Sequence, residues 1–533
     1  MLAPRQRRQS PPGRSRSVNL PAPTGGWNAR DDLADMPILD AVQMTNWFPS
    51  TTSVNLRKGY TVYSTFSGQG ETLMYYSGGA TKHWFVVAKP AGTANIYNIT
   101  AGGAVGAAAV SGLTNARFQY VNNTTSGGSY IQGVNGADKM VFYNGTVWAR
   151  DGDGVPYDIT GVNSANCINI CLHQNRVWMV QKDTLKAWYL PSGAIGGAAT
   201  VLDLSSFAQR GGSLVACAPW TMDAGYGIND MLAFITTNGE VIVYQGTDPA
   251  SAATWSMVGV WWLGAPVGTR CWVKYQGDLA LITEDGILPM AAALQSSRLN
   301  PRVAISEKIQ DAVSKAVTLY GSNFGWQLIP FPKENMLILN VPVSAGDNQE
   351  QYVMSTIKRS NGEYSWCNFT GWDANCWELV DDALYFAGNG FAAIAWDGLD
   401  DDGTNIAGDC IQAFSKFGNT DGQMRFTMMR PTLFTNGTPQ ILASVNVDFN
   451  LATLNSPLSF SPTAYATWDG VTVASRWDSA IWGSDLTVQN NWQGATGIGY
   501  WGATSLQAAA QGIEVQWAAT TLVMERAMPG MIL

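Results

Sequence analysis

Short apolar runs separated by turn residues recur along most of the chain. Met231–Tyr244 holds two apolar, β-rich runs around Asn238-Gly239, and Leu279–Met290 repeats this arrangement around Asp285-Gly286. Asn-Gly and Asp-Gly between apolar runs are strong hairpin signals, because both central residues of a type I′ turn need a positive φ. The pattern therefore predicts two β-hairpins in this stretch.

The same hairpin-like unit occurs seven times. The units begin near Trp84, Tyr130, Val177, Met231, Leu279, Met336 and Leu384, at intervals of 46, 47, 54, 48, 57 and 48 residues. A period near 50 residues built of short strands predicts an all-β fold with a β-propeller of about six to seven blades, each a small four-stranded sheet. An irregular stack of β-sandwiches would give a similar rhythm and is the alternative.

One segment has a helical period instead. Apolar residues recur on one helical face at Ile309, Ala312, Val313, Ala316 and Val317. Ser306 precedes them as a possible N-cap, and Gly321 follows them. We expect one amphipathic helix over about 306–320, packed on the outside of a blade or at a subunit contact.

The two ends of the chain differ from the repeats in composition and sequence pattern. Residues 1–23 contain Arg5, Arg7, Arg8, Arg14 and Arg16 among Pro, Ser and Gln, which predicts a disordered basic arm that either docks on an acidic partner or nucleic acid or stays solvated. The propeller with its lead segment is expected over residues 24–400, followed by a polar linker to about 424. Residues 425–533 are expected to form a separate C-terminal antiparallel β domain. Its Trp-rich loops carry Trp468, Trp477, Trp482, Trp492 and Trp501.

The composition limits the surface that this protein can present. Only 13% of residues are charged, against about a quarter in an average soluble protein. Together with 22 Trp and 56 Gly, this fits a β subunit that buries much of its surface against neighbours, or a Gly- and Asn-rich extracellular β protein. The net charge of −9 argues against a broad basic face that grips nucleic acid, although DNA could still pass a neutral or acidic lumen.

The seven cysteines are Cys167, Cys171, Cys217, Cys271, Cys367, Cys376 and Cys410. Their odd number and irregular spacing predict neither a disulfide framework nor a zinc site, but buried packing residues in a reducing cytoplasm. The spacing of Cys167 and Cys171 would place both thiols on one face of a strand. No apolar run is long enough for a membrane helix, and the N-terminus lacks the apolar segment of a secretory signal.

Candidate chemistry is sparse. The two histidines, His83 and His173, stand in no Ser/His/Asp or metal-ligand pattern, so each is expected to be structural. The acidic clusters Asp151–Asp158 and Asp397–Gly403 could supply oxygen ligands, but neither fits a calcium loop, and surface turns are the favoured interpretation. We predict no catalytic, cofactor-binding or metal-binding residue and no cofactor. The protein is not expected to be an enzyme.

Several short elements resemble one family in the same order along the chain. They are Asn46–Pro49 (Asn-Trp-Phe-Pro), Arg57–Tyr60 (Arg-Lys-Gly-Tyr), the Ile305–Ile309 helix start and Trp366-Cys367. The chain resembles the tail nozzle proteins of short-tailed bacteriophages, also called packaged-DNA stabilisation or tail-hub proteins.

The resemblance implies a structural virion protein that closes the distal end of a phage tail, retains packaged DNA and conducts it during genome ejection. It further implies a homo-hexameric ring below portal-associated and tail adaptor proteins, near tail fibres or spikes, with phage DNA in the channel. The protein would be located in the virion tail and assembled in the host cytoplasm. The alternative is a carbohydrate-binding or carbohydrate-active β-propeller, with exposed Trp side chains as sugar platforms and Asp pairs as catalysts.

Overall fold

The chain forms two compact, β-rich units. The computed structural model describes residues 15–79, 81–223, 228–295, 303–344, 346, 348–418, 422–451, 463–464 and 486–526. The propeller unit comprises residues 58–356 and 368–398, and the sandwich unit comprises residues 1–57, 357–367 and 399–533. The predicted lead segment therefore groups, as far as residue 57, with the C-terminal strands and not with the propeller.

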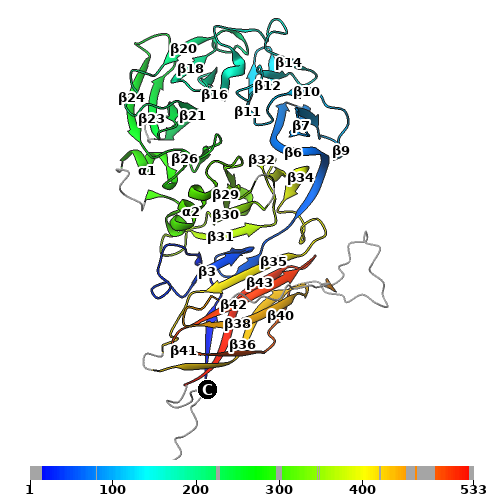
Figure 1. The fold of residues 1–533 in the computed structure, drawn as a ribbon, viewed down its shortest axis with the longest axis vertical. Helices are drawn as coiled ribbons and strands as arrows, with labels where there is room; N and C mark the ends of the chain where they lie inside the picture. The colour runs from blue at the N-terminus through cyan, green and yellow to red at the C-terminus, as the bar shows by residue number, and fades with distance from the viewer. Residues whose placement is uncertain are drawn as a thin grey trace, which may run out of the picture. The chain divides into compact units, whose positions relative to one another are not determined.

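The strands of the propeller unit form seven blades around a common centre, with the first and last blades joined in one sheet, so the predicted propeller is confirmed. Figure 1 shows β11, β16 and β21 near this centre and β14, β20 and β24 at the periphery. The first blade contains β6 (Tyr60–Gly78), β7 (Thr81–Lys89), β8 (Ala94–Asn98) and β10 (Val110–Leu113), and the second contains β11 (Gln119–Thr125), β12 (Gly128–Val134), β13 (Val141–Tyr143) and β14 (Trp148–Arg150). The third contains β16 (Cys167–His173), β17 (Arg176–Gln181), β18 (Lys186–Tyr189) and β20 (Thr200–Asp203). The fourth contains β21 (Leu214–Asp223), β22 (Ile228–Thr236), β23 (Glu240–Gly246) and β24 (Trp255–Trp262).

The last three blades contribute three strands each in chain order. Their strands are β25 (Trp272–Tyr275), β26 (Asp278–Thr283) and β27 (Gly286–Pro289); β28 (Gln327–Phe331), β29 (Met336–Val341) and β30 (Glu350–Ser355); β32 (Cys376–Val380), β33 (Ala383–Ala387) and β34 (Asn389–Ala395). Short flanking strands are β9 (Gly103–Ala104), β15 (Ile159–Thr160) and β19 (Gly197–Ala198), and the chain passes from one unit to the other within β31 (Ser365–Thr370).

One long strand closes the propeller. The first half of β6 pairs with β34 of the last sheet, with Tyr60 opposite Ala395. The second half pairs with β7 of the first sheet, from Gln69 opposite Lys89 to Gly78 opposite Thr81. The Tyr60 ring stacks on Phe391, with 5.9 Å between ring centroids. A single element from the start of the repeats therefore joins the first blade to the last.

Cores between consecutive blades hold the sheets together. Between the third and fourth sheets, Trp255 stacks on Trp178 and on Tyr244, with centroids 5.5 Å apart in both pairs. These rings belong to a buried apolar cluster that includes Leu232 and Phe234 of β22. Burial of such large apolar side chains is the main favourable contribution to folding.

The predicted helix is present, with a different start. A 3₁₀ turn, η3 (Glu307–Ile309), leads into α2 (Gln310–Tyr320), and Ile309, Val313 and Ala316 are buried. The Ser306 side chain caps no helix N–H, because its Oγ accepts the backbone N–H of Ile287. Gln310 donates to the carbonyl of Asp285, which fixes α2 beside the fifth sheet, as the first of the two expected placements requires. The other helical elements are α1 (Met290–Gln295), η1 (Ser164–Asn166) and η4 (Pro332–Glu334).

The predicted hairpins exist, but their turn type was wrong. At the β22–β23 turn only Gly239 has a positive φ, and its N–H bonds to the Thr236 carbonyl. At the β26–β27 turn only Gly286 does. Paired positive φ values, the mark of a type I′ turn, occur instead at Gln174-Asn175, Gln276-Gly277 and Asp381-Asp382, between the first and second strands of their sheets.

The sandwich unit packs two sheets face to face. One contains β4 (Trp47–Pro49), β5 (Val54–Leu56), β43 (Val515–Arg526), β36 (Met424–Thr435) and β40 (Thr487–Gln489), with β1 (Arg16–Pro21) paired to β43 and β41 (Gln493–Gly499) to β36. The other contains β2 (Gly26–Trp27), β3 (Asp40–Thr45), β35 (Ile406–Gln412), β42 (Gly502–Ala510) and β38 (Gln440–Val447), and β37 (Gly437–Thr438) pairs with β39 (Thr463–Ala464). The core between them includes Leu20, Phe426, Val445 and Leu522.

Two expectations fail in this unit. Residues 16–21 of the predicted disordered arm form β1, which pairs along its whole length with β43, because Leu20 gains a buried position there. Arg5, Arg7, Arg8 and Arg14 lie outside the described residues. The supposed polar linker contains β35, which is held between β3 and β42. The antiparallel C-terminal β domain is present, but strands from both ends of the chain build it.

Candidate functional site

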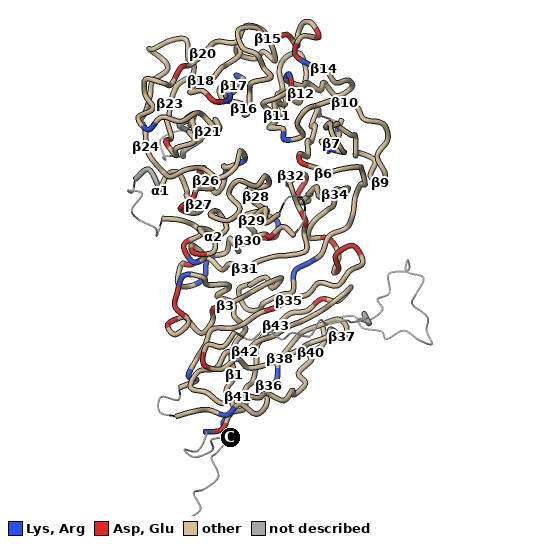
Figure 2. Tube along the Cα trace, viewed as in Figure 1, with Lys and Arg blue, Asp and Glu red and all other residues tan. Residues whose placement is uncertain are grey.

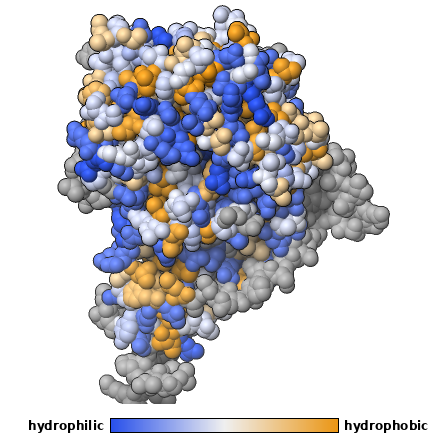
Figure 3. All heavy atoms as spheres, turned by 45° about the horizontal axis from the view of Figure 1, so that its top comes forward, coloured by the Kyte–Doolittle hydropathy of each residue, from blue (hydrophilic) through white to orange (hydrophobic). Residues whose placement is uncertain are grey.

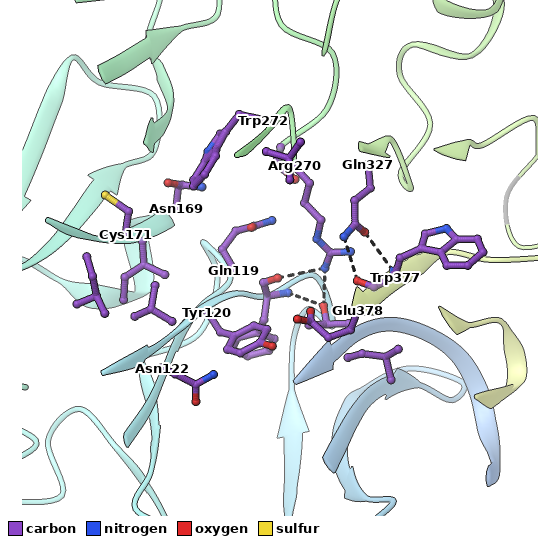
Figure 4. Close-up of a pocket in the computed structure, with 18 of the residues that line it drawn as sticks. Gln119, Tyr120, Asn122, Asn169, Cys171, Arg270, Trp272, Gln327, Trp377 and Glu378 are labelled. Carbon is purple, nitrogen blue, oxygen red and sulfur yellow. Dashed lines mark hydrogen bonds between the residues drawn. The ribbon is translucent and has the colours of Figure 1, made fainter. Parts of the chain in front are cut away.

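The propeller axis holds a polar cavity of about 520 Å³. The innermost strands of several blades line it. Figure 4 shows the side chain of Arg270, which lies two residues before β25, reaching across the centre toward β6 and β11. Polar side chains from four other blades surround it: Gln119, Tyr120 and Asn122 of β11, Asn169 of β16, Gln327 of β28 and Glu378 of β32.

Arg270 is fixed by a single nitrogen. Its Nη2 donates to the carbonyl oxygens of Glu71 (3.0 Å) and Phe118 (3.2 Å) and to Oγ1 of Thr72 (2.9 Å). The guanidinium also lies 5.2 Å from the ring centroid of Phe324. Within the described part of the chain, Nη1 and Nε of Arg270 have no protein acceptor, so each of these donors is available to other molecules.

Glu378 is the carboxyl group of the cavity. Burial raises its pKa to about 7, against the opposing effects of a hydrogen bond with Tyr120 and of the nearby Arg270 charge. The pKa of Tyr120 is raised well above its usual value, chiefly by burial. At neutral pH the cavity therefore holds one fixed cation and one carboxyl group that is close to half protonated.

A second feature joins residues that lie far apart in the sequence. The guanidinium of Arg57 is buried, donates from Nη1 to Asp401 (2.7 Å) and pairs with the other oxygen of that carboxylate through Nη2. Its Nε donates to Oδ1 of Asn46 (2.9 Å), and Nδ2 of Asn46 donates to the carbonyl of Ala407 (2.8 Å). We call Asn46, Arg57 and Asp401 the Arg57 cluster. A buried bidentate pair of this kind leaves a costly unpaired charge when either partner is removed.

The acidic clusters are used within their own turns. In the first, Asp151 accepts the Ile159 N–H and the Ser164 hydroxyl, Asp153 accepts the Arg150 N–H, and Asp158 accepts the Gly154 N–H. In the second, Asp400 accepts the Gly403 N–H, and Asp401 belongs to the Arg57 cluster. Among the described residues, no three His, Cys, Asp or Glu side chains gather closely enough to hold a metal ion. These acidic residues thus stabilise their own turns, except Asp401, which pairs with Arg57.

The two histidines lie in aromatic surroundings. Nδ1 of His83 is 2.7 Å from the hydroxyl of Tyr143, and its ring contacts Phe85. His173 is buried beside Trp255, and burial lowers its pKa. Both lie in or beside blade cores, as expected of structural residues.

All seven cysteines are free and buried, which confirms their interpretation as packing residues. Burial raises the pKa of Cys271 to about 12. The expectation that Cys167 and Cys171 share a face is wrong: the strand register shifts between Cys167 and Asn169, and the two thiols enter different cores. A β-bulge reverses the facing of the residues beyond it.

Few of the described tryptophan rings have a face exposed to solvent. Of those described, only Trp262 and Trp492 are among the exposed large apolar residues. Arg210 covers Trp262 at 3.8 Å from its ring centroid, and Arg430 covers Trp492 at 4.8 Å. Trp501 packs against Phe449 and Lys416, and Trp468, Trp477 and Trp482 lie outside the described residues. Figure 3 shows hydrophobic residues in small groups among hydrophilic ones on the face it draws.

Comparisons with known proteins assign this chain to no family. No protein-family model matches the chain, and no curated protein matches it. Similar solved structures include the β-propeller domain of Cps50 (Swd1) from Myceliophteria thermophila, with 15% identity over 63% of this chain and 98% of that chain and a TM-score of 0.37. Others are BBS1N in complex with ARL6DN (8% identity, 63% and 96% covered, TM-score 0.36) and Raptor from Chaetomium thermophilum (11%, 64% and 29%, 0.37). Likenesses this distant carry no information on function.

In the part of the chain that the structure describes, every helix is too short or too polar to serve as a membrane span.

Proposed function

We propose that this protein is a structural subunit of a virion, the tail nozzle of a short-tailed bacteriophage, which retains packaged DNA and conducts it during ejection. The observation that carries the proposal is the Arg57 cluster. Asn46 and Arg57 begin the two elements, Asn46–Pro49 and Arg57–Tyr60, on which the family resemblance mainly rests, and the two side chains bond to each other and are both buried. Two sequence elements whose side chains bond to each other are expected to occur together in members of one family. A chance match of two surface loops would not place their side chains in contact.

The size of the axial cavity supports a conduit formed by several subunits. A cavity of about 520 Å³ equals a cube about 8 Å on a side, and the side chain of Arg270 crosses it. A DNA duplex, whose major groove alone is about 12 Å wide, does not fit such a space. In this proposal DNA passes through the middle of a homo-hexameric ring, and each propeller contributes only part of the wall.

The same proposal assigns the partners and the location. The ring sits in the virion tail, after assembly in the host cytoplasm, and contacts tail adaptor and portal-associated proteins and tail fibres or spikes. The Arg-rich residues before β1 dock on an acidic neighbour. A chain lacking residues 1–14 retains β1 and should fold, but it should enter tails less efficiently than the full chain. Equal incorporation of both chains would contradict this docking role.

The channel wall is proposed to be neutral to acidic. Figure 2 shows charged residues spread thinly along the trace, in keeping with their share of 13%, and the net charge of the chain is −9. Each phosphate neutralised by a protein cation adds salt-sensitive affinity, with a slope of about −0.9 per contact, so a basic wall would hold the duplex. Asp401 of the Asp397–Gly403 turn is buried in its ion pair, so this side chain cannot serve as a gate of the channel.

The alternative, a carbohydrate-binding or carbohydrate-active propeller, finds less support. Arginines cover one face of each exposed Trp among the described residues, and the Asp carboxylates accept hydrogen bonds within their turns. A sugar platform needs an open ring face, and glycoside hydrolysis needs two carboxyl groups that face a common substrate.

Two measurements test the proposal. The first is the oligomeric state of the purified full chain, by light scattering and electron microscopy, with antibody labelling of phage particles. Rings in solution and a label at the distal tail are expected, whereas a monomer that binds glycans would overturn the proposal. The second is duplex DNA binding at low and moderate salt. Weak binding is expected, and tight binding that falls steeply with salt would contradict the neutral-to-acidic wall.

A further inference from the structure

We propose that the axial cavity of the propeller is a binding site for a small organic carboxylate, with the guanidinium of Arg270 as its anchor. This inference does not depend on the nozzle assignment. It rests on the shape of the cavity, on the unused N–H donors of one cation, and on the polar side chains that face it.

The charge and the unused donors of Arg270 favour a carboxylate. Three protein acceptors hold Nη2, which fixes the plane of the guanidinium, while Nη1 and Nε keep N–H groups that point to different sides of it. Each of these groups can donate one charge-assisted hydrogen bond to a carboxylate oxygen, and such bonds are roughly twice as strong as those between neutral groups. Preorganisation by the protein reduces the entropy lost on binding.

The rest of the lining suits a small molecule with one charge. Gln119 directs its amide toward the centre, and Gln327 is held in place by its two hydrogen bonds with the backbone of Trp377. Val121, Ile170 and Leu328 supply apolar surface for a carbon skeleton. A volume of about 520 Å³ lies within the usual range of ligand pockets, roughly 300–1,000 Å³. With a single cation and a carboxyl group nearby, the cavity is poorly suited to a doubly charged phosphate.

Glu378 makes the binding depend on pH. When it is ionised it competes with the ligand for the Arg270 charge, and when it is protonated it leaves the cavity with a net positive charge. The ionisable groups around it are Tyr120 of β11, Arg270, Cys376 two residues earlier, Tyr385 opposite it in β33, and Glu71, which Arg117 pairs at 3.0 Å. Burial raises the pKa of Glu378 to about 7, so its protonation changes within the physiological range. Carboxylate binding should therefore weaken as the pH rises through about 7.

Calorimetry with the full chain tests this inference, with benzoate as the probe and benzamide as its neutral isostere. Benzoate should bind at pH 6, and roughly tenfold more weakly at pH 8, where about a tenth of Glu378 would remain protonated. Benzamide should bind at least about tenfold more weakly than benzoate at pH 6, since it lacks the charge that Arg270 recognises. Equal binding of benzamide, or of inorganic phosphate, would overturn the carboxylate assignment.

Variants separate this site from a general effect on folding. Glu378→Gln should bind benzoate at pH 8 as well as the unaltered protein does at pH 6, and its affinity should not change with pH. A gain of binding cannot come from damage to the fold. Arg270→Gln should lose about ten- to a hundredfold in affinity, and Arg270→Lys should lose less, since the charge remains. Lys82→Gln, which removes an exposed cation of the same unit, is the matched control and should change nothing. Unaltered affinity in Arg270→Gln, or pH-dependent binding in Glu378→Gln, would refute the proposal.

Discussion

The two units assemble their strands by opposite routes. In the propeller unit, sheet neighbours are mostly sequence neighbours: β11 to β14 and β21 to β24 pair in chain order. In the sandwich unit, β1 at the start of the chain pairs with β43 at its end, from Arg16 opposite Met524 to Pro21 opposite Ala519. Local pairing leaves a repeating pattern in the sequence, whereas distant pairing leaves none. The propeller could therefore be recognised from sequence. For the sandwich unit, the sequence predicted a C-terminal β domain but not its strands from the start of the chain.

The prediction with the largest expected effect concerns the Arg57–Asp401 ion pair. It tests whether a unit whose strands pair over long sequence distances depends on single interactions. Replacing Arg57 with Met leaves the buried Asp401 carboxylate unpaired, and we expect the free energy of unfolding of this unit to fall by about 3–5 kcal/mol. Denaturant unfolding with a probe in each unit should show the sandwich transition moving and the propeller transition unchanged.

Two controls sharpen the result. The double variant Arg57→Met/Asp401→Leu removes both charges and should recover most of the loss. Lys82→Ala breaks an ion pair of the propeller whose partners are 52% and 65% exposed, and it should have no measurable effect. If the double variant were as unstable as the single one, the ion pair would not be the cause.

The next effect concerns β1. Leu20 is 4% exposed and packs in the core between the two sheets, so Leu20→Ala should destabilise the sandwich unit by about 2–4 kcal/mol. Leu319→Ala is the matched control, because Leu319 is 57% exposed on α2. Thermal unfolding of both variants provides the measurement. If the Leu20→Ala and Leu319→Ala variants had equal melting temperatures, residues 16–21 would behave as part of the solvated arm predicted for residues 1–23.

A smaller effect, confined to the propeller, depends on pH. The raised pKa of Glu378 means that the folded state holds its proton more tightly than the unfolded state, whose pKa is near 4.5. Ionisation therefore costs folded-state stability, and the unaltered propeller loses stability as the pH rises from about 4.5 through about 7. Glu378→Gln should be more stable at pH 8, by at most about 3 kcal/mol, and equally stable at pH 4. Urea unfolding at both pH values decides this, and a difference of the same size at pH 4 would rule out titration as the cause.

The smallest effect tests local turn chemistry. Asn175 has a φ of 56° at the second central position of the β16–β17 turn, where glycine is preferred. Asn175→Gly should raise the stability of the propeller unit by less than about 1 kcal/mol, since relief of left-handed strain is partly offset by added freedom in the unfolded chain. The same change at Asn144, whose side chain accepts the N–H groups of Thr146 and Val147, should be destabilising.

The physical reason why the repeat was visible lies in the second strand of each blade. The predicted hairpin starts at Trp84, Tyr130, Val177, Met231, Leu279, Met336 and Leu384 all fall in second strands, β7, β12, β17, β22, β26, β29 and β33. Most of these strands are buried along much of their length, as β29 is at every position, and so they appear as continuous apolar runs. First and fourth strands have mixed patterns, and their limits could not be predicted in the same way.

The residues that sequence reasoning missed are ones whose role is set by distant partners. β35 contains Gly408 and Asp409 and has the composition of a linker, yet Asp409 accepts the amide of Gln43 and the strand is paired on both sides. Arg270 and Glu378 each stand alone in the sequence and meet only because successive blades return to one axis. A polar residue in or just before the first strand of a blade was the available signal, but it does not identify its partners.

The shared strand β6 has a consequence for synthesis. The propeller is sealed by Tyr60–Ser64, which leave the ribosome early and pair with Ala392–Ala395, more than three hundred residues later. Until that last blade emerges, the edge of β6 that faces β34 is unpaired, and only Ser64 and Thr65 of its first half have a strand partner, β9. The nascent chain therefore exposes an open, apolar sheet edge. Blades made of consecutive hairpins can form as they emerge, so closure is expected to be the slow, non-local step. A chain arrested before residue 389 should therefore be protease-sensitive at residues 60–66 and a target for chaperones, while its middle blades are already protected.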